Sequence, residues 1–352
     1  MATMYPDIPN GRVHISDPAD LIAAVPAMLG FTPHRSLVLI CIGGTPSTVQ
    51  TVMRHDLPEP GAVHDEGALE RLAMLCEHAD ARLAVAVVVD ERAIAGDPVH
   101  GTHHALAEYL SVVLADVGVA LVGAHAVTAV VAGAQWWSLL GDDRHGSLPD
   151  PTASKVAAAQ VFQGRPIRGS RGELEQLLAP RARGHRDRVA RLLAVARHPA
   201  SGARSRSGGA ALDEVLAHIV DSAGHLADEA IVAVSLALED SDIRDSVLGL
   251  AVTEMADAAE AAWIAMVRSL TGQARAEPAA LLGFSAYARG DGPLAGVALA
   301  VALAADPEHR LAGLLDDALQ HGIRPDVIED LAHTGRDVAK ALGVTLPPAA
   351  CA

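Results

Sequence analysis

The feature that most restricts the fold of this chain is a change in the spacing of its apolar residues. Residues 37–42 and 83–89 are continuous apolar runs of strand length, which is typical of strands buried on both faces. Apolar residues in 69–76 and 106–117 instead recur every three or four positions, as on one face of a helix. Residues 119–122 form a further strand-like run. This alternation predicts parallel strands with helices packed on them.

Hairpin signals add antiparallel strands to this pattern. Gly43 and Gly44 follow the first apolar run directly, and residues 48–57 read as its hairpin partner. Two short strands are expected at 125–132 and 135–140. We therefore predict an α/β N-terminal domain with a mixed, partly parallel sheet.

The second half of the chain shows only helical spacing. From Ser154 onward no strand pattern recurs, and residues 199–209 (PASGARSRSGG) have the composition of a linker. We predict an α/β domain at 1–180, an Arg-rich helix and Ser/Gly/Arg linker at 181–209, an all-helical domain at 210–342 and a tail at 343–352.

Charge is distributed unevenly along the chain. The net charge is −16, and only Lys155 and Lys340 are lysines among the 27 basic residues. Residues 165–206 nevertheless hold eleven arginines against three acids. An acidic chain disfavours nonspecific binding to nucleic acid, and no aromatic residues are interleaved with these arginines for base stacking. Acidic groups of this chain or of a protein partner are the expected counter-charges.

The cysteines and the apolar runs indicate the compartment. Cys41, Cys76 and Cys351 are odd in number and widely spaced, which suits a reducing environment rather than a disulfide framework. Cys41 lies in a buried strand and Cys76 on the inner face of a helix, so we expect both to be reduced and buried. The N-terminal residues lack the pattern of a secretory signal, and no apolar run is long enough to span a membrane. These features predict a cytoplasmic protein.

One helical hairpin has the spacing of a tetratricopeptide repeat. Gly283, Ala295 and Ala302 are small residues placed where two antiparallel helices would touch, and Gly290 with Asp291 supplies the turn. We expect the turn near 289–292 and a costly backbone conformation at Gly290. The alternative is an ordinary helical hairpin, since repeat arrays need about three copies.

Several segments resemble a known family. ISDPADLIAAVPAMLGFTPHRSLVLICIGG (15–44) is similar to the opening of the domain of unknown function 4192 family. Further similar segments are RHDLP (54–58), WWSLL (136–140), SLPDPTASKVAAAQVFQGR (147–165), SRGEL (170–174) and the stretch 276–315. The resemblance implies no mechanism. It does imply that a cysteine-containing insert found in many members is replaced here by GDDRHGS (141–147), which has no cysteine.

Asp90, Asp56 and Ser36 are the candidate catalytic residues. Asp90 follows a buried strand, and ligands of open α/β sheets bind beyond the carboxyl ends of the strands. The sequence favours the alternative, in which Asp90 caps the next turn. Asp56 and Ser36 lie within the segments that resemble the family.

Arg165, Ser154 and Lys155 are candidates for binding a ligand or an anion. Thr152 to Lys155 only loosely resembles a serine–lysine pair, and Ser154 reads better as a helix N-cap. An ion pair is the favoured role of Arg165.

The two tryptophans Trp136 and Trp137 are candidate contact residues. Neighbours on a strand face opposite sides, so one is expected in the core and the other is free to anchor a partner; burial on both faces is the alternative.

The histidines at 100, 103 and 104 are expected to mark a solvated helix start rather than a metal site. No cofactor is expected.

Three functions remain open. The first is a non-catalytic interaction or regulatory protein that binds protein partners through the helical domain. The second is an enzyme or small-ligand binder at the carboxyl edge of the sheet. The third, and the least favoured, is nucleic-acid binding through the Arg-rich segment. The lack of a complete catalytic motif favours the first.

Overall fold

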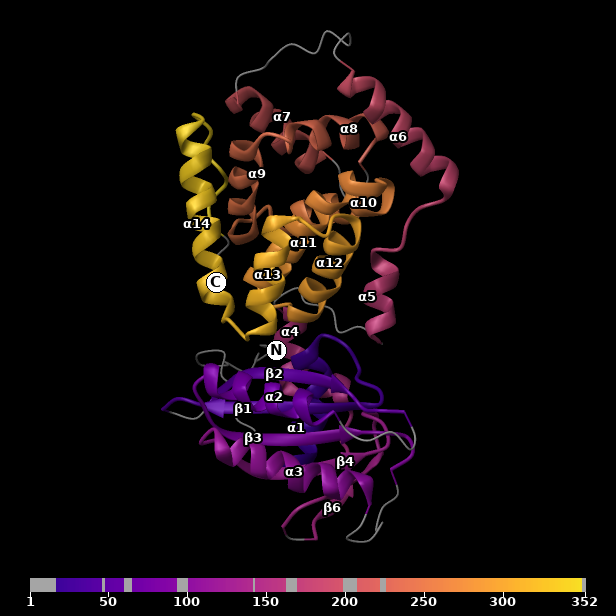
Figure 1. Cartoon of the computed structure of the whole chain (residues 1–352), viewed down its shortest axis with the longest axis vertical. Coiled ribbons are helices and arrows are strands. Elements are labelled where there is room, and N and C mark those ends of the chain that lie inside the picture. Colours follow the sequence, from indigo (N-terminus) through magenta and orange to yellow (C-terminus); the bar gives the residue numbers. More distant parts are fainter. Residues whose placement is uncertain are drawn as a thin grey trace, which may run out of the picture. The chain divides into compact units, whose positions relative to one another are not determined.

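The chain divides into two compact units in the computed structural model, Met1–Glu173 and Leu174–Ala352. The structure describes residues 17–45, 48–59, 65–93, 101–141, 143–162, 170–198, 208–221 and 226–349. Most of the predicted linker at 199–209 therefore lies outside the described residues. The first unit has an α/β fold and the second is all-helical, as predicted (Figure 1).

The first unit is built on a mixed sheet of six strands among the described residues, in the order β2-β1-β3-β4-β5-β6. Only β3 and β4 are paired in parallel within this part of the chain. Its elements in chain order are α1 (Pro18–Leu29), β1 (Ser36–Gly43), β2 (Thr48–Asp56), α2 (Glu66–His78), β3 (Ala81–Val89), α3 (Thr102–Asp116), β4 (Ala120–Val127), β5 (Gln135–Ser138), β6 (His145–Ser147), the 3-10 turn η2 (Pro151–Ala153) and α4 (Lys155–Phe162).

The core of this unit lies between the sheet and the helices α2 and α3. Alternate residues of β1 and β3, such as Leu39 and Ala86, pack there against Leu69 of α2 and Leu110 of α3. The intervening side chains of β1, such as Val38, are equally buried on the other face. Burial on both faces explains why β1 and β3 appear in the sequence as unbroken apolar runs.

One prediction for this sheet is wrong. Separate strands were expected at 119–122 and 125–132, whereas β4 runs without interruption from Ala120 to Val127. The strand continues through Gly123 with an irregularity, because its pairing with β3 shifts by one residue between Leu121 and Gly123. The hairpin of β1 and β2, with Gly44 at positive φ, is confirmed.

The second unit consists of packed helices. Its elements are α6 (Arg183–Arg197), α7 (Gly208–Asp221), α8 (Asp228–Ala237), α9 (Ser241–Leu248), η4 (Gly249–Val252), α10 (Ala256–Ser269), η5 (Gly272–Arg275), α11 (Ala276–Ala288), α12 (Gly292–Ala305), α13 (Arg310–Gln320) and α14 (Pro325–Ala341), and α5 (Arg171–Leu177) begins just before the boundary between the units. No helix within the described part of the chain combines the length and apolar character needed to cross a membrane.

The arginines of α6 face acids of the same unit. Arg188 pairs with Asp228, and Arg197 Nε donates to Glu239 Oε1 over 2.7 Å. The opposite face of α6 is buried through Val189 and Leu193. Two arginines of this segment thus have acidic partners within the same unit.

The predicted hairpin of α11 and α12 is present, and the two helices lie side by side (Figure 1). Gly290 in the turn has φ +77°, as expected for a position that favours glycine. A Cβ at Gly283 would lie 2.7 Å from Leu299 Cδ2, so the helices touch closely at this glycine. Ala302 has no solvent exposure.

Replacing Ala302 with Leu should overpack the hairpin and lower the free energy of unfolding by about 1–3 kcal/mol. Ala300 on the same helix is exposed and provides the matched control: Ala300→Leu should change the free energy by no more than about 0.5 kcal/mol. Urea unfolding of the full chain measures both. Equal midpoints for the two variants would contradict the close packing at Ala302.

Candidate functional site

The sheet brings the three candidate catalytic residues to one edge. Ser36 at the start of β1 pairs with Asp56 on β2 and with Val89 on β3. Asp90 follows Val89, and its backbone N–H donates to the carbonyl of Val127 at the end of β4. This is the carboxyl edge of the parallel pair β3 and β4, where the sequence places a candidate site.

Asp90 is the most constrained side chain at this edge. Its carboxylate is fully buried and accepts from Arg92 Nη2 at 2.7 Å, from the backbone N–H of Arg92 at 3.0 Å and from His103 Nε2 at 3.0 Å. Burial alone would raise the pKa of Asp90, but the hydrogen bonds and positive charge of Arg92, with His103, lower it to about 2. Asp90 therefore caps the turn after β3 and anchors the first turn of α3, and it is a poor proton acceptor.

Ser36 and Asp56 are joined by one arginine. Arg54 Nε donates to Ser36 Oγ over 2.7 Å, and its Nη2 pairs with Asp56. Ser36 Oγ donates in turn to the carbonyl of His34. A serine nucleophile needs an adjacent base, and Ser36 has none among these partners. These contacts hold β1 and β2 together at the edge.

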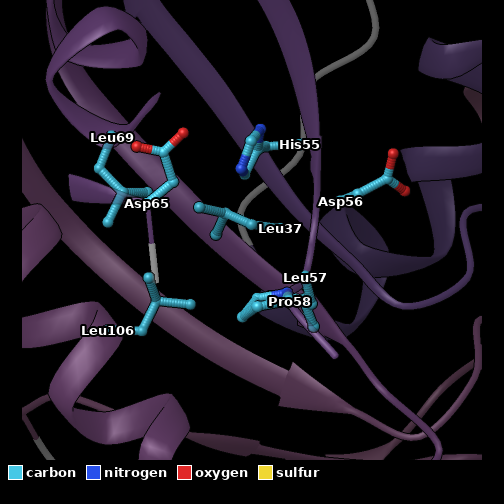
Figure 2. A pocket seen from close by; sticks show the side chains of 8 residues that line it. All are labelled: Leu37, His55, Asp56, Leu57, Pro58, Asp65, Leu69 and Leu106. Carbon is cyan, nitrogen blue, oxygen red and sulfur yellow. The ribbon is translucent and has the colours of Figure 1, made fainter. Parts of the chain in front are cut away.

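A small pocket opens beside these residues. It has a volume of about 230 Å³, and its wall is mainly apolar: Leu37, Leu57, Pro58, Leu69 and Leu106, with His55, Asp56 and Asp65. Figure 2 shows that the Asp56 carboxylate points away from the other lining side chains. Asp65 is engaged as the N-cap of α2, accepting from Ala68 N at 3.1 Å. Ligand pockets usually measure roughly 300–1,000 Å³, so this one would hold only a small apolar group.

The anion-binding candidates have local roles where they are described. Ser154 Oγ accepts from the backbone N–H of Ala157 at 3.1 Å, which makes it a helix cap as the sequence favoured. Lys155 is exposed. Arg165 lies outside the described residues.

The paired tryptophans face opposite sides of β5, as expected. Trp136 is buried, and its ring meets that of His125 edge to face at a centroid distance of 5.2 Å. Trp137 is half-buried and packs against the core beside α2 and α3. His125 was not recognised from the sequence, where its only signal is a lone polar residue between Ala124 and Ala126. Burial and the charge of Arg144 lower the pKa of His125 to about 4.

The histidines at the start of α3 bind protein groups. His103 contacts Asp90, and His104 Nδ1 contacts the carbonyl of Leu139 while its Nε2 lies 3.2 Å from Glu108. His100 lies outside the described residues. The part of the chain that the structure describes contains no group of three His, Cys, Asp or Glu side chains placed to hold a metal ion.

The helical unit contains a second pocket, which sequence reasoning missed. Its volume is about 240 Å³, and residues from five segments of this unit line it: Arg197, Ser235, Leu238, Glu239, Gln273, Ala274, Glu277, Pro278, Asp306 and His309. These residues are up to 112 positions apart in the sequence, and no local motif links them. Three carboxylates and one arginine face this pocket.

Glu277 is the unusual group in this second pocket. Its Oε2 contacts His309 Nε2 at 3.2 Å, whereas its Oε1 is buried and has no hydrogen-bond partner in the described part of the structure. The Nδ1 atom of His309 accepts from the backbone N–H of Ala312 at 3.2 Å, so Nε2 carries the proton that Glu277 receives. The hydrogen bond to Glu277 raises the pKa of His309, although burial opposes the shift.

Asp90→Asn should lower the free energy of unfolding by about 2 kcal/mol at pH 7. The charged carboxylate has its hydrogen-bond partners only in the folded state, and the variant loses them. The pKa of Asp90 is depressed, so its contribution is present above about pH 4 and is lost as the pH falls toward 2. Asp56→Asn, at an exposed partner of Arg54, should cost no more than about 0.5 kcal/mol. Urea unfolding at pH 7 checks both; equal losses would refute the anchoring role of Asp90.

The lowered pKa of His125 predicts a second pH dependence of the free energy of unfolding. Its folded pKa of about 4 lies below the ordinary value of 6.5, so the unfolded chain binds an extra proton between these values. The free energy of unfolding should therefore decline by up to about 3 kcal/mol as the pH falls from 6.5 to 4. His125→Phe should lack this component. Urea unfolding of wild type and variant at several pH values measures this difference. If the free energy of unfolding falls equally in both between pH 6.5 and 4, the prediction is wrong.

The comparisons with known proteins agree with the sequence resemblance. No curated protein and no solved structure matches the chain. A family model described as "Domain of unknown function (DUF4192)" matches residues 18–326, which covers most of both units. The chain therefore belongs to the DUF4192 family.

Proposed function

We propose that this protein is a non-catalytic, cytoplasmic interaction protein, and that its helical unit binds a lysine or arginine side chain of a partner protein. The single observation that carries the proposal is Glu277, a residue that lines a pocket and whose buried Oε1 atom lacks a donor within the described structure. A buried carboxylate oxygen without a partner is costly, and a cationic donor from a ligand would satisfy it.

The other charges of the pocket favour the same ligand. Arg197 is engaged with Glu239, and Asp306 accepts from Gln273 Nε2 at 3.0 Å. Three carboxylates face one arginine in this pocket, so its lining is acidic. An acidic ligand would be repelled, whereas the ammonium of a lysine or the guanidinium of an arginine would be attracted.

The candidate residues at the edge of the sheet are already paired within the fold, which favours the helical unit as the place of binding. Asp90 and Asp56 are each paired with an arginine of their own turn or strand, and none of the hydrogen-bond partners given for Ser36 is a base. Among the residues that the structure describes, the alternative of an enzyme or small-ligand binder at that edge therefore has no poised group to support it. The small apolar pocket beside His55 keeps a small ligand as the second outcome to be tested.

The tetratricopeptide-like interpretation of α11 and α12 belongs to this proposal. The close contact at Gly283, the turn at Gly290 and the buried Ala302 are compatible with one repeat. Glu277 lies in the first turn of α11, so the proposed binding group stands at one end of this hairpin.

The test begins with the full chain as bait in a native lysate, followed by identification of retained proteins and metabolites. Binding of a retained partner is then measured for wild type, Glu277→Gln and the control Glu308→Gln, an exposed acid near the pocket. Losing one charge-assisted hydrogen bond should weaken binding about tenfold or more for Glu277→Gln. The control should stay within about twofold.

The partner provides a reciprocal check. Changing the basic residue of its binding segment to a neutral one should weaken binding to wild type but have little further effect on Glu277→Gln. Equal binding by wild type and Glu277→Gln would refute the pocket. A retained metabolite that is lost with a His55 variant would instead establish the small-ligand alternative.

A further inference from the structure

Cys41 and Cys76 meet in the core of the α/β unit. Cys41 lies on β1 and Cys76 near the end of α2, and neither residue has any solvent exposure. No disulfide joins them in this structure, and their Sγ atoms are 2.7 Å apart; their burial was expected from the sequence. Thirty-five residues separate them in the chain, so only the packing of α2 on the sheet brings them together.

The distance between the sulfur atoms is informative. It exceeds the ~2.05 Å of a disulfide bond and is much shorter than the separation of two sulfur atoms that merely touch. The two sulfur atoms face each other so closely that no thiol hydrogen fits between them. The proximity of Cys76 and burial raise the pKa of Cys41. A small approach of α2 toward β1 would bring the two atoms to bonding distance.

We propose that Cys41 and Cys76 form a reversible disulfide that fastens α2 to β1. The proposal does not depend on the binding function assigned to the helical unit. With a peroxide as oxidant, one sulfur attacks a peroxide oxygen, and one water leaves as a sulfenic acid forms. The second sulfur then displaces the hydroxyl group, which takes the remaining thiol proton and leaves as a second water. Two thiols and one hydrogen peroxide thus give one disulfide and two waters.

Burial decides how fast this reaction runs. An oxidant reaches these sulfur atoms only when α2 or the strands open locally, so oxidation in the native protein should be slow and should accelerate in mild denaturant. The product would stabilise the unit, because the bond restricts the unfolded chain between residues 41 and 76. It would also hold α2, whose residue Leu69 lines the small apolar pocket (Figure 2).

The test uses the full chain with Cys351→Ser, which removes the third thiol. The protein is reduced, treated with hydrogen peroxide, denatured and alkylated, and its intact mass is measured. The reduced protein should take up two alkyl groups. The oxidised protein should take up none, have lost two hydrogen atoms, and recover both sites after reduction. Its urea midpoint should be higher than that of the reduced protein, and the difference should vanish with reductant.

A peptide map of the wild-type chain tests for the same bond without relying on a variant that could misfold. Trypsin cleavage after Arg35, Arg54, Arg71 and Arg82 places Cys41 and Cys76 in peptides 36–54 and 72–82. Without reductant these peptides should be recovered as one cross-linked species after oxidation. The proposal is overturned if both thiols stay alkylatable after prolonged peroxide treatment in mild denaturant, or if either cysteine gains oxygen instead of the pair losing hydrogen.

Discussion

Close approach of backbones, made possible by small residues, is the constraint on which this structure depends. Aromatic residues make up only 3% of the chain, so large rings cannot fill the cores. Interiors must still be close-packed, and the elements therefore come nearer to one another. A Cβ at Gly335 of α14 would collide with the carbonyl of Asp245 on α9, and one at Gly283 would overlap Leu299. Alanine, valine and leucine fill the remaining space.

The two units satisfy their buried polar groups differently. At the edge of the sheet, Asp90 is fully buried but receives hydrogen bonds from Arg92 and His103, so its charge is compensated within the fold. In the helical unit, Glu277 has one compensated oxygen and one that lacks a partner within the described residues. A satisfied carboxylate stabilises the protein, whereas an unsatisfied one that lines a pocket attracts a ligand. This difference is why the proposed function lies in the helical unit.

The cysteine pair shows the same close packing in another form. Helix α2 packs on the sheet through small side chains such as Ala73, which faces the same core as Ala84 of β3, and the two sulfur atoms meet in that core. A bond at that point would tie together elements that otherwise hold by apolar packing alone. The α/β unit would then gain stability without any change in its surface, while the pocket of the helical unit would be unaffected.

The sequence alone predicted the elements whose signals are local. Strands β1 and β3 appear as apolar runs because both of their faces are buried, and the turn at Gly290 appears because a positive φ favours glycine. It also placed Asp90 at the end of a strand and Ser154 at a helix cap, since caps depend on neighbours two or three residues away.

Only the tertiary structure decided which distant groups meet. His125 lies against Trp136, Cys41 against Cys76, and Glu277 against His309, on elements whose packing no local pattern reports. The prediction of separate strands at 119–122 and 125–132 was wrong, because the pairing with β3 continues past a one-residue register shift at Gly123. Local propensity acts over a few residues, whereas charge compensation, pocket formation and thiol pairing depend on the distances that the whole fold sets.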